Sequence, residues 1–259
     1  MFNKNYLTYI FIAFILLGCK NVFKQKDRPK VSAEILDTIK LVPARIVAAP
    51  VLLETAYIKG TIQKGNTANI NLYGVTIGKL KIATGHIIAC DPLHMDEYGK
   101  PFTQVFPMGE FPVQLSIAEV AGEETVAFAR IKFSEEPVAR WELALLEGEQ
   151  PLPVGGKEIH GYGVDAGIGI FMDQEALKNL SQDQLLEMEE KIYTDILAEM
   201  DKHYHVDWKY AMFNFRNQNL AAFTTGIGDG RYASYIGFDA AGKPCRLVTD
   251  FGLFDWKKK

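Results

Sequence analysis

The chain has 259 residues, of which 48% are hydrophobic and 23% are charged, and its formal net charge is −4 at pH 7. These are ordinary globular values, and the length suffices for one large domain with its own core. The acidic balance argues against a general nucleic-acid binder, which usually carries a basic surface, so we expect no nucleic-acid partner.

The N-terminus indicates a lipoprotein leader. Lys4 supplies a positive charge, and the apolar residues 7–17 are too few to cross a membrane, which takes about 20. The stretch ends in Leu16-Leu17-Gly18-Cys19, which resembles the lipobox of bacterial lipoproteins, whose cysteine is lipidated. The alternative is an ordinary secretion signal with an incidental cysteine. We predict a signal peptide over residues 1–18 and a protein of the bacterial cell envelope, anchored to the membrane through lipidated Cys19 and facing outside the cytoplasm.

A basic segment follows the cysteine. Residues 20–30 contain five lysines and arginines against a single acid, Asp27. This composition predicts a solvated tether over residues 19–30, which could also lie against anionic lipid headgroups. The remaining residues, 31–259, are predicted to form a single domain.

Alternating patterns indicate strands between residues 56 and 146. Apolar side chains recur at every second position in residues 111–117, 127–133 and 141–145. A period of two is typical of half-buried antiparallel strands. In the second run, the pattern predicts that Ala127, Ala129, Ile131 and Phe133 share one face.

A helical segment is predicted over about 173–203. Asp173 can cap a short helix, and Ser181 with Gln184 forms a capping box for a longer one. Leu185, Met188, Ile192, Ile196 and Met200 recur at spacings of three or four, which places them on one helical face.

Strands return after Ala221. Residues 232–238 and 246–251 flank the turn-rich residues 239–244, which predicts a hairpin. Together these patterns predict an α+β fold: a predominantly antiparallel β-sheet with one helical excursion.

Several acids stand beside glycine or proline, where a ligand can approach the backbone closely. Asp165 lies in the glycine-rich residues 161–169, Asp229 lies between two glycines, Asp91 precedes Pro92, and Asp250 ends the last predicted strand. If they converge, these carboxylates could bind a divalent cation or act as a general acid/base pair. The alternative is that they build turns and accept hydrogen bonds from nearby backbone amides.

Arg140 and Glu142 share one face of a predicted strand, opposite Trp141. They could form an exposed ion pair, or they could line a polar pocket with Asp165. We therefore take Asp91, Arg140, Glu142, Asp165, Asp229 and Asp250 as the candidate polar site.

Motifs for other chemistry are missing from the sequence. It has no phosphate-binding loop, no G-x-S-x-G nucleophile elbow, and no cysteine or histidine spacing typical of a zinc site. No nucleotide, haem or zinc cofactor is predicted, and the catalytic residues stay unassigned. Cys90 and Cys245 remain after lipidation of Cys19. In an oxidising envelope they could form one disulfide, or they could be buried free thiols.

These clusters together resemble the bacterial proteins grouped as domain-of-unknown-function family 4241, over roughly residues 82–251. The matching stretches are residues 89–92, 101–103, 109–118, 137–142, 161–167, 228–232, 237–239 and 248–251. The resemblance implies no established activity. The chain departs from the usual family pattern at Ile170, and its leader is not a general family feature. The C-terminal pattern is also similar to the end of SUKH-type immunity proteins, which bind and block a toxin.

Two classes of function follow. The predicted anchor, the acidic balance and the lack of a nucleophile or metal motif favour a lipid-anchored binding module, immunity-like or scavenging, with a protein partner and without catalysis. The alternative is an acid-dependent hydrolase or transferase that uses the Asp/Gly-rich segments as a pocket. A third hypothesis is a structural lipoprotein in which these segments only build turns.

Overall fold

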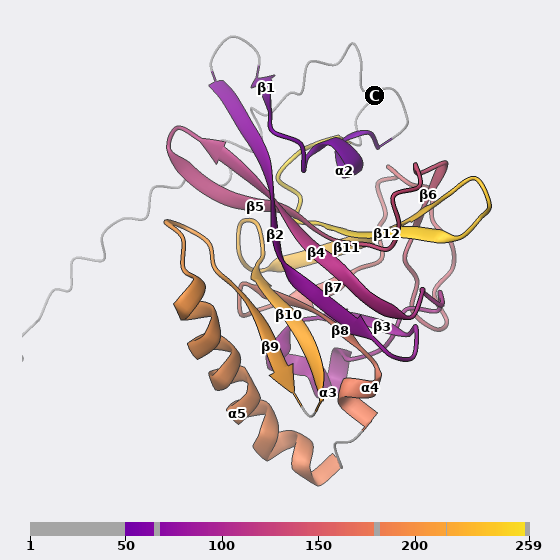
Figure 1. Ribbon diagram of the computed structural model, residues 1–259, viewed down its shortest axis with the longest axis vertical. Coiled ribbons are helices and arrows are strands. Elements are labelled where there is room, and N and C mark those ends of the chain that lie inside the picture. The colour runs from indigo at the N-terminus through magenta and orange to yellow at the C-terminus, as the bar shows by residue number, and fades with distance from the viewer. Residues whose placement is uncertain (1–49, 65–67, 179–181, 216, 257–259) are drawn as a thin grey trace, which may run out of the picture. The chain divides into compact units, whose positions relative to one another are not determined.

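The computed structural model describes residues 50–64, 68–178, 182–215 and 217–256 (Figure 1). All of them belong to one compact unit, Ser32–Lys259. The predicted leader, Cys19 and the tether lie outside the described residues. Those three features therefore stay predictions.

The described chain is built mainly from strands. Its helices are short except for one, and they are α2 (Leu52–Thr55), α3 (Met95–Tyr98), α4 (Glu175–Lys178) and α5 (Gln182–Met200), with 3₁₀ turns η1 (Pro92–His94) and η2 (Asp201–His203). The strands are β1 (Gly60–Lys64), β2 (Ala68–Ile82), β3 (Ile87–Cys90), β4 (Gly109–Val120), β5 (Glu123–Lys132), β6 (Arg140–Leu143), β7 (Tyr162–Val164), β8 (Ile168–Asp173), β9 (Tyr210–Phe215), β10 (Gln218–Thr224), β11 (Gly230–Phe238) and β12 (Pro244–Asp250).

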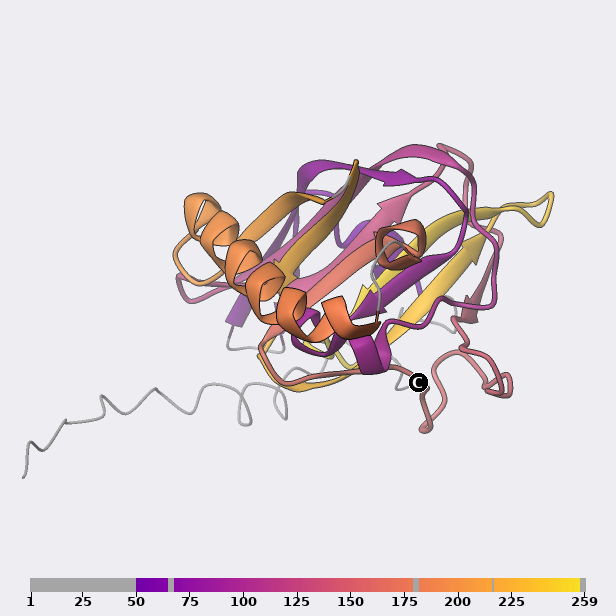
Figure 2. The ribbon, with the colours of Figure 1, turned by 90° about the horizontal axis from the view of Figure 1, so that it is seen from below.

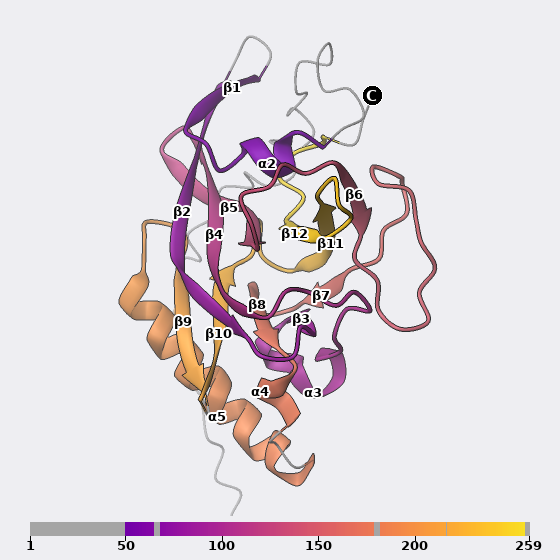
Figure 3. The same ribbon diagram turned by 45° about the vertical axis from the view of Figure 1, so that its right-hand side comes forward.

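The strands form two antiparallel sheets (Figures 1 and 3). The large sheet has the order β1-β2-β4-β5-β12-β11-β6, and β7 pairs with the same strand, β11, that carries β6. The small sheet has the order β3-β8-β10-β9. This confirms the predicted α+β fold with a predominantly antiparallel sheet, and the hairpin β11–β12 forms where the pattern predicted it.

Three apolar clusters hold the layers together. The largest fills the space between the sheets, with Leu115 and Leu247 from the large sheet facing Phe171 and Phe223 from the small one. A second cluster covers the outer face of the large sheet with α2 and the C-terminal residues 253–256. The third lies between the small sheet and α5, which crosses the outer face of that sheet (Figure 2). Burying apolar area on both faces of each sheet stabilises this layered arrangement.

β-Bulges decide which side chains reach each cluster. On β2, Ile70 and Leu72 pack on the outer face, whereas Leu80 and Ile82 pack between the sheets, because the register shifts at Gly78. A second bulge between β4 and β5 makes one sequence prediction wrong. It turns Ala127 to the outer cluster, while Ala129 packs between the sheets. One extra residue in a strand moves the side chains before it to the opposite face of the sheet. A prediction from alternating apolar residues therefore assigns those side chains to the wrong face.

The helical excursion is confirmed at α4 and α5. Asp173 caps α4 by accepting a hydrogen bond from the backbone N–H of Glu175 (2.9 Å). Ile192, Ile196 and Met200 are buried against the small sheet, as their spacing predicted. Ser181 and the side chains of Leu185 and Met188 lie outside what the structure describes. Within the described residues, no helix combines the length and apolar character needed to cross a membrane.

The two cysteines left open by the sequence are both buried, and both are thiols outside any disulfide. Cys90 ends β3 in the cluster beneath α5, whereas Cys245 lies on β12 of the large sheet and its Sγ donates to the carbonyl oxygen of Gly237 (3.3 Å). The structure therefore contains no Cys90–Cys245 disulfide. Burial also raises the pKa of the Cys245 thiol.

Candidate functional site

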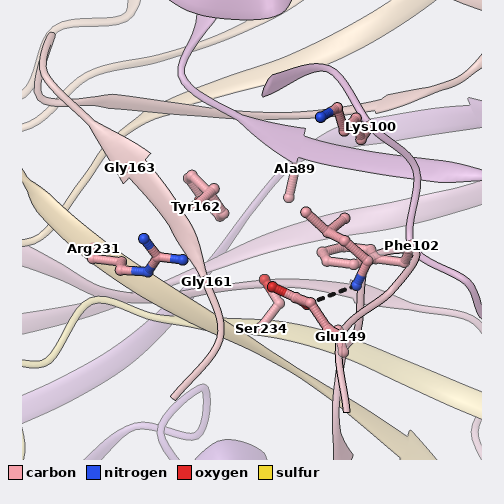
Figure 4. A pocket seen from close by; sticks show the side chains of 11 residues that line it. Ala89, Lys100, Phe102, Glu149, Gly161, Tyr162, Gly163, Arg231 and Ser234 are labelled. Carbon is pink, nitrogen blue, oxygen red and sulfur yellow. Dashed lines mark hydrogen bonds between the residues drawn. The ribbon is translucent and has the colours of Figure 1, made fainter. Parts of the chain in front are cut away.

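A pocket opens where one edge of β11 changes partners. β7 pairs with residues 230–232 of β11, and β6 pairs with residues 235–238, so the two short strands leave a break at Ala233 and Ser234. The chain leaves β6, makes a long excursion over residues 144–161, and returns as β7 (Figure 3). The break is lined by Ala89, Lys100, Phe102, Ala144, Leu146, Glu149, Gly161, Tyr162, Gly163, Arg231 and Ser234, which we call the β6–β7 pocket (Figure 4).

Small residues create the space. Ser234 lies in a stripe of β11 whose other members, Tyr232, Ile236 and Phe238, are large and pack between the sheets. Its hydroxyl is satisfied by the Thr249 hydroxyl across the strand pair (2.8 Å), so the position stays open. Alanines at 89 and 144 and glycines at 161 and 163 add to the opening, which has a volume of about 140 Å³. A cavity of about 150 Å³ holds a benzene molecule.

The glycines at 161 and 163 serve different purposes. A Cβ built at Gly161 would lie 2.3 Å from the carbonyl oxygen of Tyr232, so only glycine lets the chain approach β11 there. A Cβ at Gly163 would meet no heavy atom within 4 Å. Gly163 lies directly opposite Arg231 in the β7–β11 pair, and residues opposite each other share a face. The missing side chain at Gly163 therefore leaves room beside Arg231.

Two cations stand at the pocket. Lys100 and Arg231 are exposed, and neither forms an ion pair or hydrogen bond with another residue in the described part of the chain. Figure 4 shows the Arg231 guanidinium and the Lys100 ammonium on opposite sides of the opening, with Tyr162 and Ala89 between them. The apolar surface below them comes from Phe102, Leu146 and the two alanines.

The acid of the pocket, Glu149, is held by its own loop. One carboxylate oxygen accepts the backbone N–H of Leu146 (2.8 Å), and the other lies 3.3 Å from Nδ1 of His160. The Nε2 of His160 lies 2.8 Å from the carbonyl oxygen of Gln150, and since a carbonyl only accepts, Nε2 donates this bond. These contacts join the two ends of the excursion and fix the wall of the pocket.

Three of the candidate acids lie around two neighbouring crossings between the sheets. Residues 165–167 link β7 to β8, and residues 225–229 link β10 to β11. The crossings touch: Thr225 N–H donates to the Gly167 carbonyl (3.0 Å). The structure thus brings the Asp165 and Asp229 turns side by side, and Asp91 lies beneath the first one.

Their chemistry differs from the acid/base hypothesis. Asp91 is fully buried, and its two oxygens accept three backbone N–H groups, from Leu93 (2.8 Å), Asp165 (2.7 Å) and Ala166 (2.8 Å). The Asp165 carboxylate points to solvent, with 74% of its side chain exposed and the Nε2 of His94 at 3.4 Å. Asp229 is exposed. Asp91 therefore fastens the crossing, as the turn-building alternative proposed.

The other candidates lie elsewhere. Arg140 and Glu142 pair with Phe238 and Ile236 at the far end of β11, eight and six residues from Gly230, or roughly 26 and 20 Å at 3.3 Å per residue. They form the predicted exposed ion pair (2.8 Å), and the guanidinium covers the Phe238 ring. Arg140 lines a different groove of about 380 Å³, together with Glu54 and Trp141. Asp250 accepts hydrogen bonds from Gly252 N–H (2.9 Å) and the Trp256 indole (2.8 Å).

Buried arginines fasten α2 to the large sheet. Arg246 donates to both carboxylate oxygens of Glu54 (2.9 and 3.3 Å), and Arg130 lies 3.5 Å from the same group. Arg130 also stacks over the Tyr57 ring at 3.7 Å. The Arg246 guanidinium donates to the Glu54 carboxylate and to the carbonyl oxygens of Ser134 and Cys245, so its place in this cluster has a structural explanation.

Tyrosines near the pocket are poor acid/base groups. Burial raises the pKa of Tyr162, and burial raises the pKa of Tyr232 to about 12. Both hydroxyls stay protonated at neutral pH. Among the described residues, no three His, Cys, Asp or Glu side chains are arranged to hold a metal ion. What the β6–β7 pocket offers is a small apolar space with two cations at its opening.

Comparison with known protein families matches residues 80–249 to the family described as "Protein of unknown function (DUF4241)". The chain belongs to this family. The match covers both sheets from the end of β2 to β12, and it includes every residue of the β6–β7 pocket. Comparisons with curated proteins and with solved structures found no match.

Sequence reasoning found part of this site. It singled out the glycines at 161 and 163 and the Gly-Asp-Gly turn before Arg231, but it selected the aspartates as the functional groups. Lys100 and Glu149 lie in loops without any periodic signal. Arg231 lies within one of the stretches that resemble the family, at residues 228–232. Its position opposite Gly163 would have marked it as a candidate, but that position follows only from the pairing of β7 with β11.

Proposed function

We propose that this DUF4241 protein is a lipid-anchored binding module of the bacterial cell envelope, and that the β6–β7 pocket is its ligand site. The observation that carries the proposal is the pocket's composition: small residues open a space between two strands, and two cations without partners in the described chain stand at its mouth. Ligand sites are typically apolar hollows with a few polar groups that fix orientation.

Binding has more support than acid-dependent catalysis. A general acid or base must reach a substrate, and Asp91 is occupied by three backbone N–H groups. Glu149 lines the pocket but is engaged by Leu146 and His160. A purely structural lipoprotein would have no need for an open space maintained by two alanines, a serine and two glycines. An immunity-like role with a protein partner stays a hypothesis that no feature of the pocket favours over a small ligand.

A blocked pocket tests the proposal. We expect small aromatic compounds to raise the melting temperature of the full-length protein, since a ligand present at 100 times its Kd stabilises by about 2.7 kcal/mol. The variant Gly163→Leu places a side chain beside Arg231 in open space and should abolish the shift without loss of stability. The matched control is Gly60→Leu at the exposed start of β1, outside the pocket lining, where a Cβ would meet only the Ile58 carbonyl oxygen, at 3.7 Å. Equal shifts in wild type and Gly163→Leu would contradict the proposal.

The anchor is tested separately in cells. Metabolic labelling with radioactive palmitate should label the wild-type protein, and Cys19→Ser should remove the label and release the protein from the membrane fraction. Unchanged labelling in Cys19→Ser would refute lipidation at this cysteine.

A further inference from the structure

The charges at the β6–β7 pocket indicate a class of ligand, on the basis of the proposed function of this pocket as the ligand site. Of its three charged side chains, the acid Glu149 is already engaged within its loop, whereas Lys100 and Arg231 have no ion-pair partner among the described residues. The pocket therefore presents two positive charges, which no acid of the described chain neutralises, above an apolar surface. Its volume of about 140 Å³ suits a single ring or a short branched chain.

From this juxtaposition we infer that the ligand is a small free carboxylic acid with an apolar body. The apolar part enters between Phe102, Leu146 and Ala144, and the carboxylate stays at the mouth between Lys100 and Arg231. A planar guanidinium binds a carboxylate through two parallel hydrogen bonds, and a lysine ammonium adds a mobile point charge. Gly163 on β7 lies opposite Arg231 and has no side chain, so a ligand can reach the guanidinium from the side of β7.

Competing ligand charges fit less well. A cationic group would approach two like charges and would find only Glu149, whose oxygens already accept from Leu146 and face His160. A neutral ligand would bury the same apolar area but leave the two cations without a partner. The structure thus favours an anion over a neutral or cationic ligand of the same shape.

Three probes of nearly equal size test the inference: phenylacetate, 2-phenylethanol and 2-phenylethylamine. We expect phenylacetate to bind the full-length protein at least about fivefold more tightly than the alcohol, because two partly exposed ion pairs each contribute modestly. The amine should bind more weakly than the alcohol. Isothermal titration calorimetry at low salt gives the three dissociation constants. Raising the salt concentration should bring the affinities of the acid and the amine toward that of the alcohol, because salt screens both the attraction and the repulsion.

Variants locate the preference. Arg231→Gln and Lys100→Gln should each lower the affinity for phenylacetate while leaving that for 2-phenylethanol unchanged, and Lys157→Gln, outside the pocket lining, is the matched surface control. Equal binding of acid and alcohol, or tightest binding of the amine, would overturn the inference and leave the pocket as a binding site. Failure of all three probes to bind would instead count against the proposed function itself.

Discussion

Replacing Asp91 by asparagine should destabilise the domain strongly, although the side chain keeps its shape. The carboxylate accepts three backbone N–H groups, two of them from the crossing at residues 165 and 166. An amide has one acceptor oxygen, so its NH₂ group must face a backbone donor at one end. The variant loses at least one charge-assisted hydrogen bond, and its NH₂ group faces a backbone N–H in a buried site. Together these changes should lower the free energy of unfolding by about 2–3 kcal/mol. Asp91→Ala removes all three acceptor contacts and should cost about 3–5 kcal/mol.

Urea denaturation followed by fluorescence measures these losses as a lower transition midpoint with an unchanged slope. Asp165→Asn is the matched control, because the Asp165 side chain is 74% exposed and should change stability by less than about 0.5 kcal/mol. If Asp91→Asn were as stable as the wild type while losing a ligand response, the structural role assigned to Asp91 would be refuted and a functional carboxylate would take its place.

Three further perturbations follow from the packing. Gly161→Ala should lower the free energy of unfolding by about 2–4 kcal/mol, since its Cβ would lie 2.3 Å from the Tyr232 carbonyl oxygen. Gly163→Ala, whose Cβ meets no atom within 4 Å, should stay within about 1 kcal/mol of the wild type, and thermal melts of both variants measure the difference. Glu54→Gln should cost about 1–3 kcal/mol in urea denaturation, because it leaves the buried Arg246 guanidinium without its carboxylate; an unaltered midpoint would contradict this role. Alkylation of Cys245 by iodoacetamide should be at least about tenfold slower in the folded than in the urea-unfolded protein, because the thiol is buried and its pKa is raised. Equal rates by peptide mass spectrometry would show that the thiol is accessible.

Local pattern predicted several individual elements of this fold. Alternation located β4, β5, β6 and β11, and the spacing of Ile192, Ile196 and Met200 predicted the buried face of α5. The error at Ala127 has a physical cause: a bulge changes the facing of a strand without changing the character of its residues. Sequence alone also gave no sign that the strands divide between two sheets.

The site was harder to predict because it depends on strand pairing. Acids beside glycines attracted the functional hypothesis, and two of their turns do meet, yet backbone N–H groups occupy the buried one. The pocket arises because β6 and β7 share one edge of β11 and leave Ser234 between them. The sequence shows Ser234 among larger apolar residues at every second position of residues 232–238. That this serine lines a pocket follows only from the pairing of β6 and β7 with β11.

The most direct test of the β6–β7 pocket as the ligand site is a set of ¹H–¹⁵N correlation spectra of the protein titrated with phenylacetate. We predict that the backbone amide signals of Gly161, Gly163 and Ser234 shift together with one dissociation constant, while that of Gly122, in the β4–β5 turn outside the pocket lining, stays in place. Shifts centred on the Arg140 groove or on the Asp165 and Asp229 turns, with none at Gly161 and Gly163, would contradict the assignment.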